Sequence, residues 1–204
     1  MKLYYTPGAC SLAVHIALRE AGVAVDLVQV DLASHRTAAG DDFYAINPRG
    51  YVPLLELEDG SRRTEVAALL QSIGEGAPAS GLVPAPGEPE RFEVQKWIAF
   101  VASELHKVFS PWLWHKETDD GTRKACKEKI ATRLAELDVL LGTREFLAGS
   151  RFSAADAYGF AIVSWAPLLG MQLTPYPRLA AWLARVAQRP AVHAALLAEG
   201  LARA

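Results

Sequence analysis

The stretch 52-VPLLELEDGSRRTE-65 decides the fold of this 204-residue chain, because a turn signal lies between two strand-like segments. Asp59-Gly60 is among the strongest short hairpin signals in a sequence, since both residue types tolerate the backbone of a tight turn. An antiparallel hairpin is therefore predicted here. The pattern EVAALLQSIGE, which begins at Glu65, predicts a helix directly after the hairpin.

Upstream of the hairpin, strand and helix patterns alternate. Residues 2–5 and 26–32 are typical of short strands, and residues 11–21 repeat apolar side chains at helical spacing. A second helix is expected around residues 36–45. The order β-α-β-α-β-β-α predicts an α/β domain of thioredoxin-like type, in which an antiparallel hairpin completes a sheet of two parallel strands.

A segment rich in glycine and proline, residues 74–90, is typical of a linker and separates two predicted domains. The thioredoxin-like domain is expected at residues 1–78 and an all-helical domain at residues 88–204. The helical patterns of the second domain cover about residues 90–115, 122–141, 153–169, 176–187 and 191–198.

Composition narrows the class of protein. The chain has 21 Lys+Arg against 23 Asp+Glu, so it lacks the basic field that nucleic acid requires. Its first residues do not read as a secretory signal, and the most apolar run, residues 157–171, is shorter than the ~20 residues of a membrane span. Two distant cysteines make neither a disulfide framework nor a metal cluster. We expect a cytoplasmic protein without bound metal, nucleic acid or membrane.

Cys10 follows a Pro-Gly turn in 5-YTPGACS-11 and is expected where the first strand leads into the first helix. The positive end of a helix favours a negative group, and it lowers the pKa of a thiol there. A small buried hydrophobe is the alternative role for such a cysteine. We favour the functional role for Cys10, whereas Cys126, in the charged helical stretch KACKEKI, is interpreted as a bystander.

Two positions around the hairpin allow a structural and a functional interpretation. Pro53 is an ordinary trans proline at a strand edge, or a cis proline that turns the Val52 backbone outward to pair with an extended peptide. Glu65 complements the helix dipole, or it joins the helix N–H groups to hold a zwitterionic ligand. The residues alone leave both questions open.

The first helix of the second domain has two faces. Its apolar stripe is predicted to be core and consists of Val94, Trp97, Ile98, Val101, Leu105, Val108, Phe109 and Trp112. At 100° per residue the other face collects small residues and a histidine, which suits a cleft wall: Ala99, Ser103, His106 and Ser110. The alternative for His106 is a surface or inter-helix histidine.

A capping box is predicted at Ser153, three residues before Asp156, ahead of the very apolar helix AYGFAIVSWA. In this arrangement each side chain accepts a hydrogen bond from the backbone N–H of the other residue. We assign the pair to folding, because a helix that is apolar all round must be central.

Five motifs in order resemble the bacterial beta-class glutathione S-transferases over the whole chain: the cysteine at the first helix, N-P-R-G-Y-V-P, T-E, S-E-L-H-K and S-x-x-D. The resemblance implies that Cys10 contacts the glutathione sulfur and that Val52, beside a cis Pro53, pairs with the cysteinyl backbone. It further implies that Glu65 holds the γ-glutamyl end and that His106 and Lys107 reach over from the helical domain. Glu104 is implied to act on the site of the neighbouring subunit of a homodimer. Tyr5 and Ser11 are the fallback hydroxyls for the glutathione thiolate.

Three positions depart from the family pattern. Val66 lacks the hydroxyl that often grips the glutamyl carboxylate, although its backbone N–H is retained. His35 stands where a lysine is often found, and Ala99 where some members have asparagine. These departures predict weakened binding of the tripeptide more than an altered fold.

The leading hypothesis is a detoxifying transferase that joins glutathione to an electrophilic small molecule. A glutathione-dependent reductase or lyase that uses Cys10 is a second enzymatic hypothesis, and a non-catalytic protein that binds apolar ligands is a third. The electrophile pocket is expected to involve variable helical residues such as Val108, Trp112 and Trp114.

Overall fold

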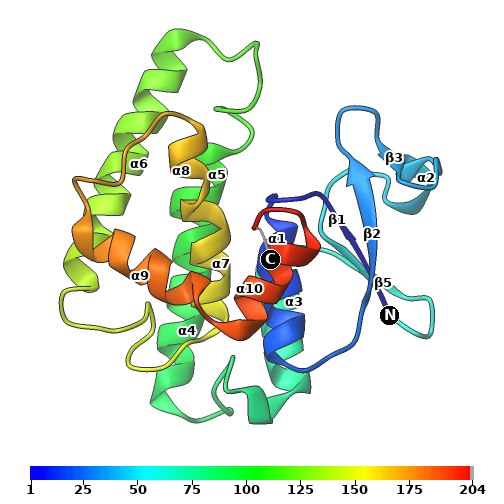
Figure 1. Cartoon of the computed structure of the whole chain (residues 1–204), viewed down its shortest axis with the longest axis horizontal. Coiled ribbons are helices and arrows are strands. Elements are labelled where there is room, and N and C mark those ends of the chain that lie inside the picture. The colour runs from blue at the N-terminus through cyan, green and yellow to red at the C-terminus, as the bar shows by residue number, and fades with distance from the viewer. Residues whose placement is uncertain (203–204) are drawn as a thin grey trace. The chain divides into compact units, whose positions relative to one another are not determined.

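The computed structural model describes residues 1–202 and divides into two compact units. One unit comprises Met1–Val83 and Arg189–Ala204, and the other comprises Pro84–Gln188. Figure 1 shows a mixed sheet with helices in the first and helices alone in the second. Within residues 1–202, no helix has the length and apolar character needed to cross a membrane.

The sheet of the first unit has the strand order β3-β2-β1-β4-β5. The central β1 pairs in parallel with β2 and antiparallel with β4, and β4 pairs antiparallel with β5. This topology confirms the predicted thioredoxin-like fold and its hairpin. The strands are β1 (Lys2–Tyr5), β2 (Asp26–Asp31), β3 (Arg36–Thr37), β4 (Leu54–Glu56) and β5 (Arg62–Arg63).

The helix expected around residues 36–45 was wrong. This segment contains the two-residue strand β3 and a single helical turn, α2 (Phe43–Ile46). Gly40 lies between them with a φ of 94°, a left-handed value that interrupts a helix. Asp42 then caps α2 by accepting a hydrogen bond from the Tyr44 N–H at 3.0 Å.

Two longer helices and a short 3-10 turn complete the part of this unit before residue 83. They are α1 (Ser11–Glu20), α3 (Val66–Gly76) and η1 (Pro78–Ser80). The predicted start of α3 was off by one residue, because Glu65 is its N-cap and not its first residue. Because α3 ends at Gly76, its last residues lie within the segment that was predicted to be a linker from residue 74.

The last helix, α10 (Pro190–Ala198), groups with the first unit, whereas the predicted helical domain ran from residue 88 to 204. Buried polar contacts explain this grouping. The His15 Nδ1 atom of α1 lies 2.8 Å from Glu199 Oε1, and Arg189 makes two contacts with Glu20, at 2.6 and 2.9 Å. A helical pattern in sequence carries no information about which partner a helix will choose.

The second unit is helical, as predicted. Its elements are α4 (Pro89–Phe100), the π-helical segment η2 (Val101–His106), α5 (Lys107–Phe109), α6 (Asp120–Leu140), α7 (Ala154–Val163), α8 (Trp165–Leu168) and α9 (Pro177–Ala187). Every residue of α7 is buried, and the capping box of Ser153 and Asp156 is present. Both observations confirm the prediction of a central capped helix.

The apolar stripe of the first helix is buried as predicted, except at Trp112. This indole is 49% exposed, so its assignment to the core was wrong. The helix ends before Trp112 because Ser110, the C-cap of α5, has extended backbone angles of −119° and 129°. Helical spacing therefore no longer applies at residue 112.

Candidate active site

Cys10 is the N-cap residue of α1 and is partly exposed. Its Sγ lies 3.3 Å from the Val52 carbonyl oxygen, so the protonated thiol donates a hydrogen bond to it. The preceding loop is fixed by a turn in which the Ala9 N–H donates to the Thr6 carbonyl at 3.0 Å. The thiol is therefore presented from a helix N-terminus toward the backbone before β4, and its predicted ionisation stays a prediction.

The Val52–Pro53 peptide bond is cis, and the backbone here lies beyond the end of the hairpin ladder. β5 pairs with Leu55 and Glu56, so its pairing stops short of Val52. The Val52 side chain is buried in a cluster with Tyr4, Val30, Phe43 and Leu54. The core thus holds Val52 firmly while its carbonyl faces the Cys10 thiol.

Glu65 has a backbone conformation that side chains rarely adopt. Its φ is 71° and its ψ is 108°, and a non-glycine residue in such a region costs about 1–3 kcal/mol. Its side chain is 69% exposed, and its Oε1 accepts a hydrogen bond from Arg49 Nη1 at 2.9 Å. The next residue, Val66, is buried and begins α3. An exposed carboxylate therefore lies next to the unpaired N–H groups of a helix N-terminus.

The turn that carries Arg49 was not identified as functional from the sequence. The buried Asn47 accepts a hydrogen bond from the Arg49 N–H and donates one to the Tyr51 carbonyl, at 3.2 and 2.7 Å. Gly50 has a φ of 67°, and a Cβ added there would lie 2.6 Å from Tyr44. The Asn-Pro pair at residues 47–48 was the available signal, since it favours a turn.

His35 packs against this same turn. Its ring lies 4.4 Å from the Tyr44 ring, and its φ is 52°. Among the described residues, its buried Nδ1 atom has no hydrogen-bond partner. The structure therefore brings His35, Tyr44 and Gly50 together beside Arg49.

Tyr5 and Ser11 both point into the first unit. Ser11 is fully buried, and its hydroxyl contacts the N–H and the carbonyl of Thr6, each at 3.2 Å. Tyr5 is 7% exposed and lies against His15, and its burial, followed by the charge of Glu199, raises the pKa of its phenol. The contacts of these two hydroxyls with a glutathione sulfur stay predictions.

In the second unit, His106 ends the π-helical segment η2 and is largely enclosed by aromatic rings. Its Nδ1 lies 2.7 Å from the Tyr158 hydroxyl, and its ring meets those of Tyr158 and Trp165 edge to face. Burial, followed by the charge of Lys107, lowers the pKa of His106 to about 4. His106 is therefore a neutral imidazole at pH 7.

The predicted cleft wall around His106 was wrong as a single face. Ala99 and Ser103 are exposed, while His106 is mostly buried, and the Ser103 hydroxyl donates to the Ala99 carbonyl at 2.9 Å. The reason is η2, because π-helical turns are wider than the α-helical turns assumed in a count of 100° per residue. Such π turns occur frequently at functional sites.

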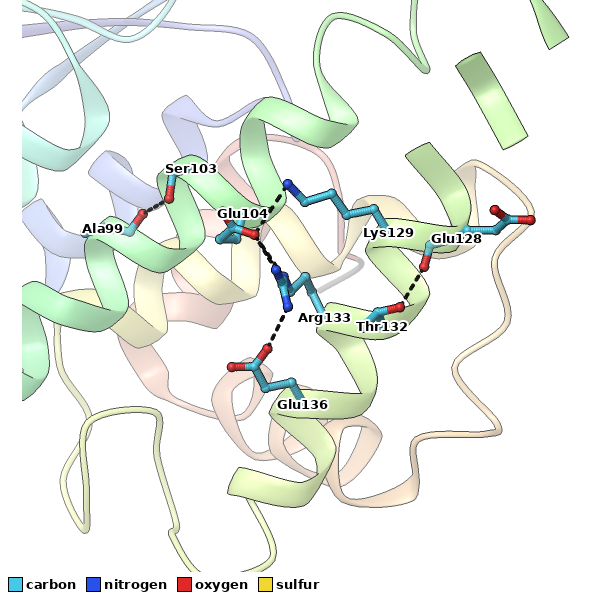
Figure 2. Close-up of polar contacts among 8 residues, drawn as sticks. All are labelled: Ala99, Ser103, Glu104, Glu128, Lys129, Thr132, Arg133 and Glu136. Carbon is cyan, nitrogen blue, oxygen red and sulfur yellow. Dashed lines mark hydrogen bonds and ion pairs between the residues drawn. The ribbon is translucent and has the colours of Figure 1, made fainter. Parts of the chain in front are cut away.

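Glu104 lies in the same π-helical segment and is held by α6 of its own chain, as Figure 2 shows. Its Oε2 atom is 2.9 Å from Arg133 Nε, 2.8 Å from Arg133 Nη2 and 3.4 Å from Lys129 Nζ. Arg133 also contacts Glu136 at 3.2 Å. The hydrogen bond from Arg133 lowers the pKa of Glu104, so its carboxylate is ionised in this cluster.

The residues expected near an electrophile differ in exposure. Val108 is 8% exposed and packed, whereas both Trp112 and Trp114 are about half exposed. Lys107, which was expected at the glutathione site, is exposed. The Trp114 ring lies 5.7 Å from that of the buried Trp165. Trp112 lines a surface depression of about 300 Å³ together with Pro111, His115, Glu117, Thr118, Asp119 and Thr122.

A thioredoxin-like unit with a cysteine at the start of its first helix, followed by a helical unit, is typical of proteins that bind or react with thiols. The model of the glutathione S-transferase N-terminal domain matches residues 8–75, and that of the C-terminal domain matches residues 100–190. The chain belongs to the glutathione S-transferase family.

Individual relatives agree with this assignment. The glutathione S-transferase GstA of Escherichia coli O157:H7 is 39% identical, over 98% of this chain and 100% of its own. A sphingomonad glutathione S-transferase solved with glutathione is 46% identical, with a TM-score of 0.93 over 99% and 100% of the two chains. The beta-class enzyme of Sphingomonas chungbukensis is 44% identical, with a TM-score of 0.94 and the same coverage.

Proposed function

We propose that this protein transfers glutathione to electrophilic small molecules and that Cys10 lies at the glutathione sulfur. In the reaction, glutathione gives its thiol proton to solvent water and its thiolate attacks an electrophilic carbon. A carbon–sulfur bond forms, and the leaving group departs with its electron pair. The family membership and the glutathione bound in the sphingomonad relative support this reaction.

One observation carries the proposal: the Cys10 thiol faces the Val52 carbonyl at 3.3 Å, beyond the point where β5 stops pairing. An extended peptide can bind there by main-chain hydrogen bonds, as in the addition of a strand to a sheet. A tripeptide bound in this way brings its cysteinyl residue to Cys10.

The remaining parts of glutathione have candidate partners in the same unit. Glu65 offers an exposed carboxylate for the α-ammonium group, and the backbone N–H groups of Val66 and its successors suit the γ-glutamyl carboxylate. We assign the glycyl carboxylate to His35, beside Arg49 on the neighbouring turn. Together these groups fit a thiol peptide that carries two carboxylates and one ammonium group.

Neutral His106 is proposed as a catalytic residue of the helical unit, where its imidazole can accept or donate a hydrogen bond without adding charge. The exposed Lys107 is proposed as a contact of glutathione, and the half-exposed Trp112 and Trp114 are proposed for the electrophile. We further propose a cytoplasmic homodimer. In such a dimer Glu104 would reach a neighbouring site only by leaving Arg133 and Lys129.

Conjugation tests the proposal directly. The wild type is expected to convert 1-chloro-2,4-dinitrobenzene with glutathione well above the uncatalysed rate, and calorimetry is expected to show glutathione binding. Cys10→Ala removes the thiol that faces the ligand, so both the rate and the affinity should change, whereas the bystander variant Cys126→Ala should match the wild type. A wild type that neither binds glutathione nor exceeds the uncatalysed rate contradicts the proposal.

The partial exposure of Cys10 also favours a second activity, thiol–disulfide exchange. The Cys10 thiolate attacks one sulfur of oxidised glutathione, a protein–glutathione disulfide forms, and the second glutathione leaves as a thiolate. Mass spectrometry after incubation is expected to show one adduct in the wild type and in Cys126→Ala. An adduct that persists in Cys10→Ala would remove Cys10 from this role.

A further inference from the structure

A chain of buried polar side chains joins the C-terminal segment to the loop that precedes Cys10. The side chains of His15 and Glu199 have no exposed surface, and His15 Nδ1 lies 2.8 Å from Glu199 Oε1. The second carboxylate oxygen, Oε2, accepts a hydrogen bond from the Gly8 N–H at 2.9 Å. Glu199 thus contacts both α1 and the loop at Gly8, which lies 191 positions before Glu199 in the sequence.

The direction of each hydrogen bond follows from Arg19. The Arg19 Nε–H group donates to His15 Nε2 at 2.8 Å, and a guanidinium can only donate. Nε2 is therefore the acceptor of the imidazole, and Nδ1 carries the proton that is donated to Glu199. The Glu199 carboxylate accepts one hydrogen bond from this imidazole and another from the Gly8 backbone, so one side chain fixes two elements.

The hydrogen bond at Gly8 lies close enough in the chain to affect the position of the Cys10 thiol. Gly8 has a φ of 70° and stands two residues before the N-cap of α1. A Cβ placed on Gly8 would lie 3.6 Å from the Leu201 side chain, so the C-terminal segment packs directly on this loop. Because two peptide units separate Gly8 from Cys10, a shift of the Gly8 N–H is transmitted to the thiol.

The C-terminal segment has a second polar contact with α1, away from the loop that precedes Cys10. Arg189, just before α10, contacts Glu20 at the end of α1 through two nitrogen–oxygen pairs of 2.6 and 2.9 Å. α10 lies along α1, as Figure 1 shows. This second contact offers a control that loosens α10 without touching the Cys10 loop.

We propose that Glu199 is a positioning residue for Cys10: by holding the Gly8 N–H, the C-terminal segment sets the place of the thiol against the Val52 carbonyl. Its functional consequence rests on the proposed role of Cys10 toward glutathione. Its structural part, the coupling of Glu199 to the thiol, stands without that role.

Glu199→Gln tests the coupling in the full chain with two probes of Cys10. The amide oxygen of the glutamine can still accept the hydrogen bond from His15, but the amide NH2 group then faces the Gly8 N–H. Two donors cannot pair, so the loop is released. Iodoacetamide should then alkylate Cys10 about three- to tenfold faster, the factor that one hydrogen bond corresponds to. Reaction of Cys10 with oxidised glutathione should slow by a similar factor, because that ligand needs the thiol in register with Val52.

Arg189→Gln is the matched control and should lower the melting temperature without changing either rate. A Glu199→Gln variant that is folded and has both rates unchanged overturns the proposal. If the wild type is alkylated but does not react with oxidised glutathione, the proposed thiol–disulfide exchange fails while the alkylation comparison still decides the coupling. Hydrogen exchange of the wild type adds a measurement that needs no variant: rapid exchange of the Gly8 amide would overturn the proposal.

Discussion

At the scale of single residues, Glu65 combines an unfavourable backbone conformation with an exposed carboxylate. Within residues 1–202, the structure shows no contact that compensates for the φ of 71°, because Arg49, the partner of the Glu65 side chain, is equally exposed. An ion pair between exposed groups contributes only about 0–1 kcal/mol. A strained backbone at an exposed carboxylate agrees with the proposed role of Glu65 in holding the ligand.

Glu65→Gly separates folding from binding. Glycine accepts a positive φ, so we expect the melting temperature to stay the same or to rise, with a gain of up to about 1 kcal/mol. Loss of the carboxylate removes a charged hydrogen bond, which should weaken glutathione binding about tenfold or more in calorimetry.

Glu65→Gln serves as the control for that variant. It keeps the strained backbone and loses only the charge, so its affinity for glutathione should fall while its melting temperature stays near that of the wild type. If Glu65→Gly destabilises the protein and leaves the affinity unchanged, the assignment of Glu65 to the ligand is wrong.

At the scale of secondary-structure elements, α7 depends on one buried carboxylate. Asp156 Oδ2 accepts hydrogen bonds from the N–H and the hydroxyl of Ser153, and its Oδ1 accepts from the Leu147 N–H and from Trp182 Nε1. The N-terminus of α7, the loop before it and α9 thus converge on a single side chain.

Asp156→Asn should be strongly destabilising. In either orientation the amide nitrogen faces at least one N–H group that can only donate: that of Ser153, or those of Leu147 and Trp182. We expect a cost of about 2–4 kcal/mol in the free energy of unfolding. Ser153→Ala is the control, since it removes one hydroxyl and should cost about 1 kcal/mol. Denaturant titrations followed by circular dichroism measure both, and equal effects would show that the carboxylate has no special role.

At the scale of the whole molecule, two buried groups make stability depend on pH with opposite signs. Burial lowers the pKa of His106 to about 4, so between pH 6.5 and 4 the unfolded chain is protonated at this residue while the folded chain is not. The free energy of unfolding therefore falls as the pH drops from 6.5 to 4. Burial raises the pKa of Asp156 to about 6, so its contribution is fully present below pH 3.8 and is lost as the pH rises through 6. The two effects oppose each other between about pH 4 and 6.

His106→Gln isolates the first effect, because glutamine does not titrate. Relative to the wild type, this variant should gain stability as the pH is lowered from 6.5 to 4, by at most about 3 kcal/mol. Unfolding measured in a series of buffers gives the difference between the two proteins. A difference that stays constant over this range would mean that His106 does not titrate as its burial requires.

The sequence by itself determined the local patterns of this protein. The Asp59-Gly60 turn, the helical periodicity of the second unit and the Ser153–Asp156 cap are each encoded by residues close together in the chain, and each is present in the structure. Cys10 was likewise placed correctly at the start of α1, because a Pro-Gly turn before an apolar period locates a helix N-terminus.

Tertiary structure decided everything that depends on distant partners. The choice of α10 for the first unit, the bond from Glu199 to Gly8 and the pairing of Glu104 with Arg133 each join residues whose spacing follows no local period. The wide π turn before His106 and the positive φ of Glu65 are backbone states that no propensity predicts. The π turn persists because packing around it outweighs its local cost, and that packing exists only in the folded chain.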